Sequence, residues 1–524
     1  MDADVLVVGA GPTGLMLANQ LARRGVRALI LDRHAGPALQ TRALAVQART
    51  LEIYAHLGIV EQALELGKRA TGANLWAEGR RAVRVPFGDI GQGLSPYPYV
   101  LILGQDDNER LLGEALGSRG MAVEWNTELV GLAQETDRVV AKLKRPDGTI
   151  RDVTAAWVAG CDGAHSAVRE LNGIAFQGAP YEDVFFVADT QATGPMVPDE
   201  LNVYLWRTGF HLFFPMRGTD HWRLVGIVPP ELRGRDDLTL DDVSPSIRKE
   251  AGPGLAFQKC SWFSTYRIHH RRAQRFRDRR CFLLGDAAHI HSPVGGQGMN
   301  TGLQDAYNLG WKLALVVSRG AGVALLDSYE AERIPVAQRL LRTTDEAFSL
   351  VISDSKLAGM LRTLLMPRVL ALAMRVESFR KLAFRTVSQT GIAYRNSPLS
   401  ETVPGLPDKA PRAGDRFPWV RLKLSPNGPV EDFFGKLDDT RFTLIAIGQA
   451  VPSDGLPGLS GLLRTFVVPS DPANDRELVR VRIPRLAFYL LRPDGHVGLA
   501  GARLDAATVA RYVSERLSLR ASTA

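Results

Sequence analysis

Short apolar runs alternate with amphipathic helical stretches at the start of the chain. Residues 5–8 are continuous valine and leucine, and residues 14–24 follow with apolar side chains at helical spacing. Gly25 ends this helix, and a second apolar run occupies residues 26–31. A buried strand, a helix and a second strand in this order predict a βαβ unit of a parallel sheet.

The middle of the chain alternates with a period of two. Residues 201–207, 210–215 and 222–228 have the composition of strands, with turns at 208–209 and 217–218. This pattern predicts an antiparallel meander.

Long helical patterns follow. Residues 303–317 and roughly 345–385 predict helices, and the piece 361–384 is basic and amphipathic. That piece has two interpretations, a helix at a membrane surface or, as we favour, a helix packed across a domain junction. A proline-rich stretch over residues 396–418 then predicts a linker or a wrapping arm.

The last part of the chain predicts a small α/β domain. A turn falls at residues 493–496, and a closing helix is expected at about 505–519. The expected strands are 442–447, 466–469, 478–483 and 487–491.

Three glycine-containing motifs carry the candidate chemistry. The first motif, Gly9 to Gly14 (GAGPTG), lies between the first strand and the first helix, where backbone can approach a pyrophosphate at the helix N-terminus. Asp32 ends the next strand, where a carboxylate binds a ribose hydroxyl. The second motif begins at Cys161-Asp162-Gly163 and the third at Gly285-Asp286. Together, in this order, the motifs indicate an FAD-dependent enzyme.

With these motifs the chain resembles the FAD-dependent aromatic hydroxylases, the single-component class A flavoprotein monooxygenases typified by para-hydroxybenzoate and phenol hydroxylases. It is most similar in appearance to members that tailor polycyclic polyketides. The specific match covers residues 1–395. The resemblance implies FAD as cofactor, NADPH or NADH and O2 as co-substrates, and hydroxylation of a phenolic or polycyclic aromatic small molecule through a flavin C4a-hydroperoxide.

The resemblance also implies the FAD contacts. Asp162 is expected near FAD and the passing NADPH, Asp286 at a ribityl or ribose hydroxyl, and Leu129 at the adenine through its backbone. For Arg42 a surface arginine, and for Gln105 a helix cap, are the alternatives. The expected contacts are Gly9, Gly11, Pro12, Thr13, Gly14, Asp32, Arg33, Arg42, Gln105, Leu129, Asp162, Gly163, Gly285, Asp286, Pro293, Gly295, Gly298, Met299 and Asn300.

The glycine-rich segment 293–302 precedes a helix. Its backbone N–H groups and the helix dipole are expected to face the N1–C2=O edge of the isoalloxazine and to stabilise the anionic reduced flavin.

In the family this antiparallel meander covers the substrate pocket. Its aromatic side chains suit a flat apolar substrate. Expected substrate contacts are Trp76, Tyr204, Trp206, His211 and Phe213, although alternation lets only about half of the aromatics face the pocket. Pro293, His211 and Tyr204 are the catalytic candidates, with His211 or Tyr204 as a base that deprotonates a phenol.

The expected fold is α/β. A Rossmann-like FAD-binding domain (1–175 and 270–345) carries an inserted mixed β-sheet substrate domain (176–269), followed by long helices and a linker (346–400). Residues 401–524 are expected to form a thioredoxin-like domain without cysteines, which makes it redox-inactive.

Bulk properties narrow the function classes. The 524 residues imply two or three domains, and the net charge is +8 with 23% charged residues. The basic run 269–280 lacks interleaved aromatics, so we expect no nucleic acid and read it as a solvated face or as an attractor of anionic NADPH. Three separated cysteines predict neither disulfides nor a metal site. We expect a cytoplasmic monomer or homodimer that does not span a membrane.

Two alternatives remain. A Baeyer-Villiger or other ring-oxidising monooxygenase on the same scaffold has no distinguishing sequence feature. A flavin-binding protein that sequesters a small molecule without turnover is the more remote possibility.

Overall fold

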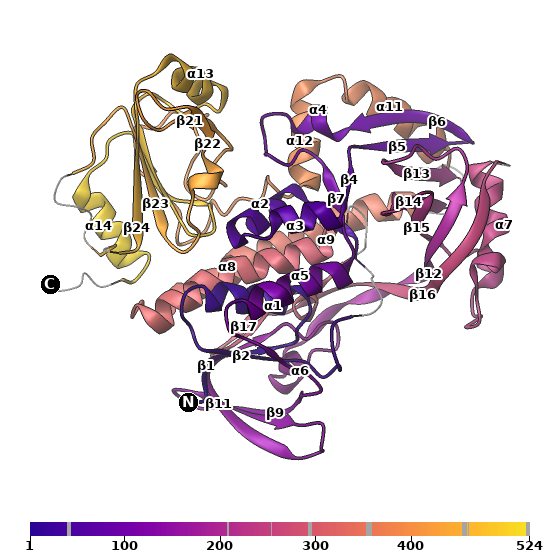
Figure 1. The fold of residues 1–524 in the computed structure, drawn as a ribbon, viewed down its shortest axis with the longest axis horizontal. Coiled ribbons are helices and arrows are strands. Elements are labelled where there is room, and N and C mark those ends of the chain that lie inside the picture. The colour runs from indigo at the N-terminus through magenta and orange to yellow at the C-terminus, as the bar shows by residue number, and fades with distance from the viewer. Residues whose placement is uncertain are drawn as a thin grey trace.

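The computed structural model describes residues 1–524 except 39–42, 207–208, 253, 292–295, 353–358, 453–457, 460 and 520–524. The described residues form two large sheets with covering helices and a separate C-terminal α/β domain (Figure 1).

The first sheet contains the predicted βαβ unit. Strand β1 (Ala3–Val8) pairs in parallel with β2 (Ala28–Leu31) and β11 (Ile150–Gly160), and α1 (Pro12–Ala22) connects β1 to β2. The sheet order is β17-β18-β11-β1-β2-β8, with β9 and β10 added beside β11. The other strands are β8 (Val123–Glu124), β9 (Glu128–Gln134), β10 (Val139–Lys144), β17 (Arg277–Asp278) and β18 (Cys281–Leu283).

Helices cover this sheet and connect it to the rest of the molecule. Helix α1 packs against α5 (Gln105–Gly117) and α8 (Gly298–Ser318). The remaining helices here are α2 (Ala48–Leu57), α3 (Val60–Leu66), α6 (Ala167–Leu171) and α9 (Asp327–Ile352). A small sheet of β3 (Ala45–Val46), β7 (Val100–Ile102) and β4 (Lys68–Ala70) lies beside them.

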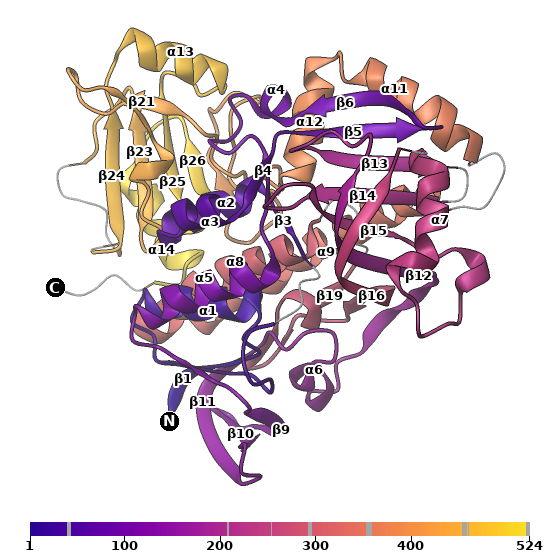
Figure 2. The ribbon, with the colours of Figure 1, turned by 45° about the vertical axis from the view of Figure 1, so that its right-hand side comes forward.

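The second sheet has the order β19-β16-β12-β15-β14-β13-β5-β6. The predicted meander is present as β13 (Leu201–Trp206), β14 (Gly209–Pro215) and β15 (His221–Ile227). The other strands are β5 (Gly72–Ala77), β6 (Arg80–Pro86), β12 (Phe176–Thr193), β16 (Ala256–Ala273) and β19 (His289–Ile290). Helix α7 (Leu240–Ala251) lies on the outer side of this sheet, away from α8 (Figure 2).

The helical region predicted at 345–385 is divided in the structure. After α9 come a short π-helix (Leu361–Leu365), α11 (Met366–Ala373) and α12 (Glu377–Val387). Helix α11 packs on β6, and α12 packs on α4 (Phe87–Gly91). Their outward side chains Leu372 and Leu382 are 65% and 63% exposed. Both helices thus pack on residues 80–91, and among the described residues no helix is both long and apolar enough to cross a bilayer.

The C-terminal domain has a five-stranded sheet of order β20-β26-β25-β23-β24. The prediction of a strand at 478–483 is wrong, because residues 478–480 belong to α13 (Pro472–Arg480) and residues 481–483 are not in a strand. Asp471 caps α13 by accepting from the backbone N–H of Ala473, and Pro472 suits the first helical turn. The other elements are β20 (Glu401–Thr402), β21 (Arg421–Lys423), β22 (Val430–Asp432), β23 (Phe442–Ile447), β24 (Leu463–Val468), β25 (Ala487–Leu491), β26 (Val497–Gly501) and α14 (Ala506–Glu515).

Two ion pairs join the C-terminal domain to the helices that cover the first sheet. Arg492 donates to Glu332 of α9 at 2.5 Å, with both side chains fully buried. Arg23 at the end of α1 pairs with Asp439 at 2.7 Å. Removing one partner of a buried pair leaves an uncompensated charge, so these contacts fix how the domains pack.

Candidate functional site

The first and third motifs meet at the side chain of Thr13. Gly9 turns the chain with φ +99°, and a Cβ on Gly14 would overlap the Gly9 carbonyl oxygen. A Cβ on Gly285 would lie 2.7 Å from Thr13 Oγ1, and one on Gly302 of α8 would overlap the same hydroxyl. The motifs and the start of α8 therefore form one closely packed unit, in which Gly14, Gly285 and Gly302 have no room for a side chain.

Asp32 lies at the end of β2, next to the first motif. Its carboxylate accepts from the N–H of Ala10 at 2.7 Å and of His34 at 2.9 Å. The Asp32 carbonyl accepts from the N–H of Thr127, which places the segment leading to Leu129 beside it. The Leu129 side chain is buried in the core, so only its backbone is available to a ligand. Arg33 is exposed.

A buried aspartate that the sequence analysis did not select holds the third motif in place. Asp305 of α8 accepts from the N–H of Gly285 at 3.0 Å, from His289 Nε2 at 2.8 Å and from Arg333 Nε at 2.5 Å. Burial alone would raise the pKa of Asp305, but Arg333 and His289 hold it below its ordinary value. The ionised Asp305 thus fixes the turn that exposes Asp286.

The second motif is connected to the third. Asp162 accepts from the N–H of Val168 at 3.1 Å, at the N-terminus of α6, and burial raises its pKa. Arg169 donates to the carbonyl of Ala164 at 2.9 Å and to that of Ala287 at 3.1 Å. Arg169 is a further residue that sequence reasoning missed, although it follows the start of the second motif closely in the sequence.

Asn300 uses its whole amide within the protein. Its Oδ1 accepts from the N–H of Gln47 and the hydroxyl of Thr50, and its Nδ2 donates to the carbonyls of Ala45 and Gly296. The side chain therefore anchors the start of α8. The backbone N–H groups of the first turn have no intrahelical acceptor, and with the helix dipole they favour a partial negative charge. Met299 is half-buried in this turn.

Gln105 opens α5 and donates to Glu109 at 2.8 Å. Glu109 also accepts from the N–H of Ala38, and burial raises its pKa. A Cβ on Gly11 would lie 4.0 Å from the Glu109 carboxylate, so the pair borders the first motif. The i, i+4 spacing of Gln105 and Glu109 was the available signal for this pair. Arg42, Pro293 and Gly295 lie outside the described residues.

Most of the predicted substrate contacts lie on the sheet face beneath α7. The register pairs Tyr204 with His211 and with Trp76, and Phe213 with Asn202, so all share this face. Trp76, Tyr204 and Phe213 belong to the apolar cluster that includes the inner side of α7. Trp206 lies at the end of the same face, half-buried, with its ring centroid 4.0 Å from His211.

His211 is fully buried there. Neither ring nitrogen has a hydrogen-bond partner among the described residues, and burial lowers its pKa to about 3. A neutral imidazole in a core is poorly placed to deprotonate a phenol. The structure gives no support for His211 as the base, and Tyr204 lies in the same core.

The opposite face approaches the start of α8. Phe214 packs on the cluster that contains Leu44 and Ala45, and a Cβ on Gly296 would lie 2.6 Å from that of Ala45. Arg223, paired with Phe214 in the register, forms an ion pair with Asp189 at 2.5 Å. This face combines an aromatic side chain with an ion pair in which Arg223 is buried and Asp189 is partly exposed.

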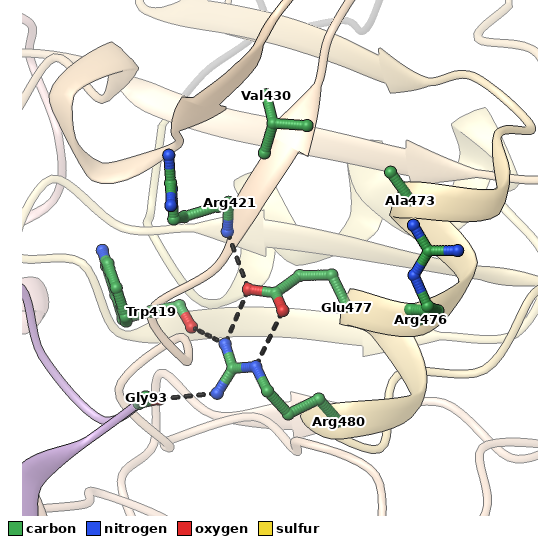
Figure 3. A pocket seen from close by; sticks show the side chains of 8 residues that line it. All are labelled: Gly93, Trp419, Arg421, Val430, Ala473, Arg476, Glu477 and Arg480. Atoms are coloured by element: carbon green, nitrogen blue, oxygen red, sulfur yellow. Dashed lines mark hydrogen bonds and ion pairs between the residues drawn. The ribbon is translucent and has the colours of Figure 1, made fainter.

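A hollow of about 370 Å³ lies at the junction with the C-terminal domain (Figure 3). It is lined by Gly93, Trp419, Arg421, Val430, Ala473, Arg476, Glu477 and Arg480. Arg480 spans it, donating to the carbonyls of Gly93 and Trp419 and to Glu477. These contacts join two domains, so we assign the hollow to the domain junction.

In the described ranges no group of three His, Cys, Asp or Glu side chains has the arrangement of a metal site. Cys161, Cys260 and Cys281 are free, and burial raises the pKa of Cys281 to about 12.

Comparison with known proteins gives a consistent result. The model of the FAD binding domain family matches residues 2–344. The 6-methylpretetramide 4-monooxygenase of Streptomyces rimosus is 34% identical over 96% of this chain and 92% of its own length. The pentachlorophenol 4-monooxygenase of Sphingobium chlorophenolicum is 30% identical over 94% of this chain and 86% of its own. The structure of an anhydrotetracycline hydroxylase from Streptomyces rimosus has a TM-score of 0.77 at 28% identity, covering 98% of this chain and 99% of that one.

Proposed function

Because the chain belongs to the family of FAD-dependent aromatic monooxygenases, we propose that it hydroxylates a phenolic or polycyclic aromatic molecule. One observation carries most weight: the first motif, the third motif and the start of α8 converge on Thr13, where neither Gly285 nor Gly302 has room for a side chain. When bound, FAD accepts electrons from NADPH or NADH and activates O2.

The residues present fit the cofactor. The glycine-only packing at Gly9 and Gly14 and the Asp32 carboxylate suit a pyrophosphate and a ribose. We propose that the exposed Asp286 binds a sugar hydroxyl and that the first turn of α8 faces the flavin ring. Asn300 and Gln105 then act by fixing these elements, because their side chains are bonded within the protein.

We propose that the substrate lies against the sheet face that carries Phe214 and the Asp189–Arg223 pair. This face adjoins Ala45 and the start of α8, whereas the face with Tyr204 and His211 is covered by α7. Two of the relatives named above act on polycyclic compounds and one on a chlorinated phenol. These names support a flat aromatic substrate for this chain.

We further propose the domain division expected from the sequence, with a thioredoxin-like C-terminal domain. Strand β23 pairs in parallel with β24 and antiparallel with β25, which pairs with β26, and α13 and α14 follow β24 and β26. This order supports the assignment. The described residues after 401 include no cysteine, so the role proposed for this domain is structural.

The test is NADPH oxidation by the FAD-loaded protein, with and without a panel of phenols and polycyclic quinones, together with H2O2 detection and product mass. Hydroxylation predicts a compound that accelerates NADPH loss and gains one oxygen with its rings intact. A gained oxygen with an opened or expanded ring would support the Baeyer-Villiger alternative. Ligand binding without any NADPH consumption would support a sequestering protein.

A further inference from the structure

Gln389 adopts a backbone conformation that glycine favours. It follows α12 and its C-cap residue Ser388, and it has φ +59°. This first position beyond a helix C-cap is usually glycine, because a Cβ is strained in the left-handed region. Gln389 is nevertheless a long side chain and only 4% exposed. A departure from the local rule at a buried position calls for a function of the side chain.

The Gln389 amide contacts the start of α8. Its Oε1 accepts from Gln304 Nε2 at 2.6 Å. Its Nε2 donates to Thr301 Oγ1 at 2.9 Å and to the carbonyl of Gln297, the N-cap residue, at 3.4 Å. The unusual backbone thus directs one amide across the first two turns of α8.

Arg333 of α9 links the same part of α8 to the segment that follows α12. Arg333 donates to the carbonyl of Thr301 at 3.1 Å and to the hydroxyl of Tyr394 at 2.8 Å. The Tyr394 ring lies 4.3 Å from that of His496 in the C-terminal domain. The segment that follows α12 therefore contacts the start of α8 directly through Gln389 and indirectly through Tyr394 and Arg333.

We propose that Gln389 is a positioning residue for the flavin. It holds the first turn of α8 so that the backbone N–H groups remain aimed at the N1–C2=O edge of the ring. This inference rests on the proposed function. Fixed N–H donors stabilise the negative charge of the reduced ring more than the neutral oxidised ring, so Gln389 raises both the affinity for FAD and its midpoint potential.

The variants are Gln389→Gly, which removes the side chain and the backbone strain, and Gln389→Asn, which tolerates the same φ but is one methylene shorter. In both variants Thr301 and Gln304 keep a hydrogen bond within α8. The Thr301 hydroxyl still donates to the carbonyl of Gln297, and the Gln304 amide still donates to the carbonyl of Asn300. Arg482→Gly is the matched control. Arg482 has φ +61° at the same position beyond α13, and it is exposed.

We expect both Gln389 variants to raise the Kd for FAD on the order of tenfold. The unfolding midpoint of Gln389→Gly should stay close to wild type, because relief of the strained backbone offsets the lost side-chain contacts. If reduced FAD loses about tenfold more affinity than oxidised FAD, the two-electron midpoint potential falls by about 30 mV. Arg482→Gly should change neither quantity.

Unchanged affinity and potential in Gln389→Gly would overturn the inference, as would an equal loss in Arg482→Gly. A wild-type protein that binds no FAD would instead overturn the proposed function itself.

Discussion

Phe213 and Phe214 are identical neighbours on β14 in opposite environments. Phe213 is fully buried beneath α7, with its ring 5.4 Å from Tyr204 and 6.3 Å from Trp222. Phe214 is half-buried and packs near Ala45, on the face that approaches α8. The pair shows that a strand divides consecutive aromatics between core and candidate site, so aromatic content alone does not locate a pocket.

The two phenylalanines should differ most in what their removal costs in free energy of unfolding. Phe213→Ala should lower the free energy of unfolding by about 3–5 kcal/mol, because it leaves a cavity in a closed core. Phe214→Ala should cost about 1–2 kcal/mol, since its ring is only partly buried. Chemical denaturation of both variants measures the difference. Equal losses would contradict the division between the two faces.

A pH-dependent effect is expected at His211. The pKa of His211 is about 3 in the folded protein and near 6.5 in the unfolded chain. Between these two pH values the imidazole is protonated only when the chain is unfolded. Its contribution to stability is therefore complete above pH 6.5 and falls by about 1.4 kcal/mol per pH unit as the pH drops toward 3.

His211→Leu removes the pH-dependent contribution of the imidazole to stability, and the leucine side chain still fills the core. The variant should lose less stability than wild type between pH 7 and 5, a relative gain of about 2 kcal/mol at pH 5. Denaturation at both pH values tests it, with wild type as the control. Parallel pH dependences for the two proteins would show that His211 is hydrated or paired in the folded state.

The effects on catalysis should have the opposite order, with a larger loss of kcat/KM for Phe214→Ala than for Phe213→Ala. Phe214→Ala should lower kcat/KM for substrate-stimulated NADPH oxidation about tenfold, which corresponds to about 1.4 kcal/mol. FAD affinity should stay unchanged, because Phe214 makes no contact with the three motifs in our assignment. In Phe213→Ala, the folded enzyme should keep its kcat/KM at low temperature. A loss confined to Phe213→Ala would place the substrate beneath α7.

The contrast also marks what sequence could predict. Strand periodicity located the meander to within one residue, and glycine spacing located the first motif, because both are local patterns. Helix α7 decides which face of the meander is covered. The alternation within the strands carries no information about the position of this helix. Asp305 and Gln389 were missed for a related reason, since their partners Arg333 and Thr301 are 28 and 88 residues away.

The smallest effect is expected for Tyr204→Phe. The Tyr204 hydroxyl is buried without a hydrogen-bond partner among the described residues, and burial raises its pKa above the ordinary value. Removing an unpaired buried hydroxyl while keeping the ring should be neutral or stabilising by up to about 1 kcal/mol. The pH profile of kcat/KM should also stay the same, because a phenol that remains protonated beneath α7 titrates outside the working range and does not reach the substrate. A tenfold loss of activity with unchanged stability would mean that the hydroxyl does contact the substrate, and the assignment of this face as core would then have to be abandoned.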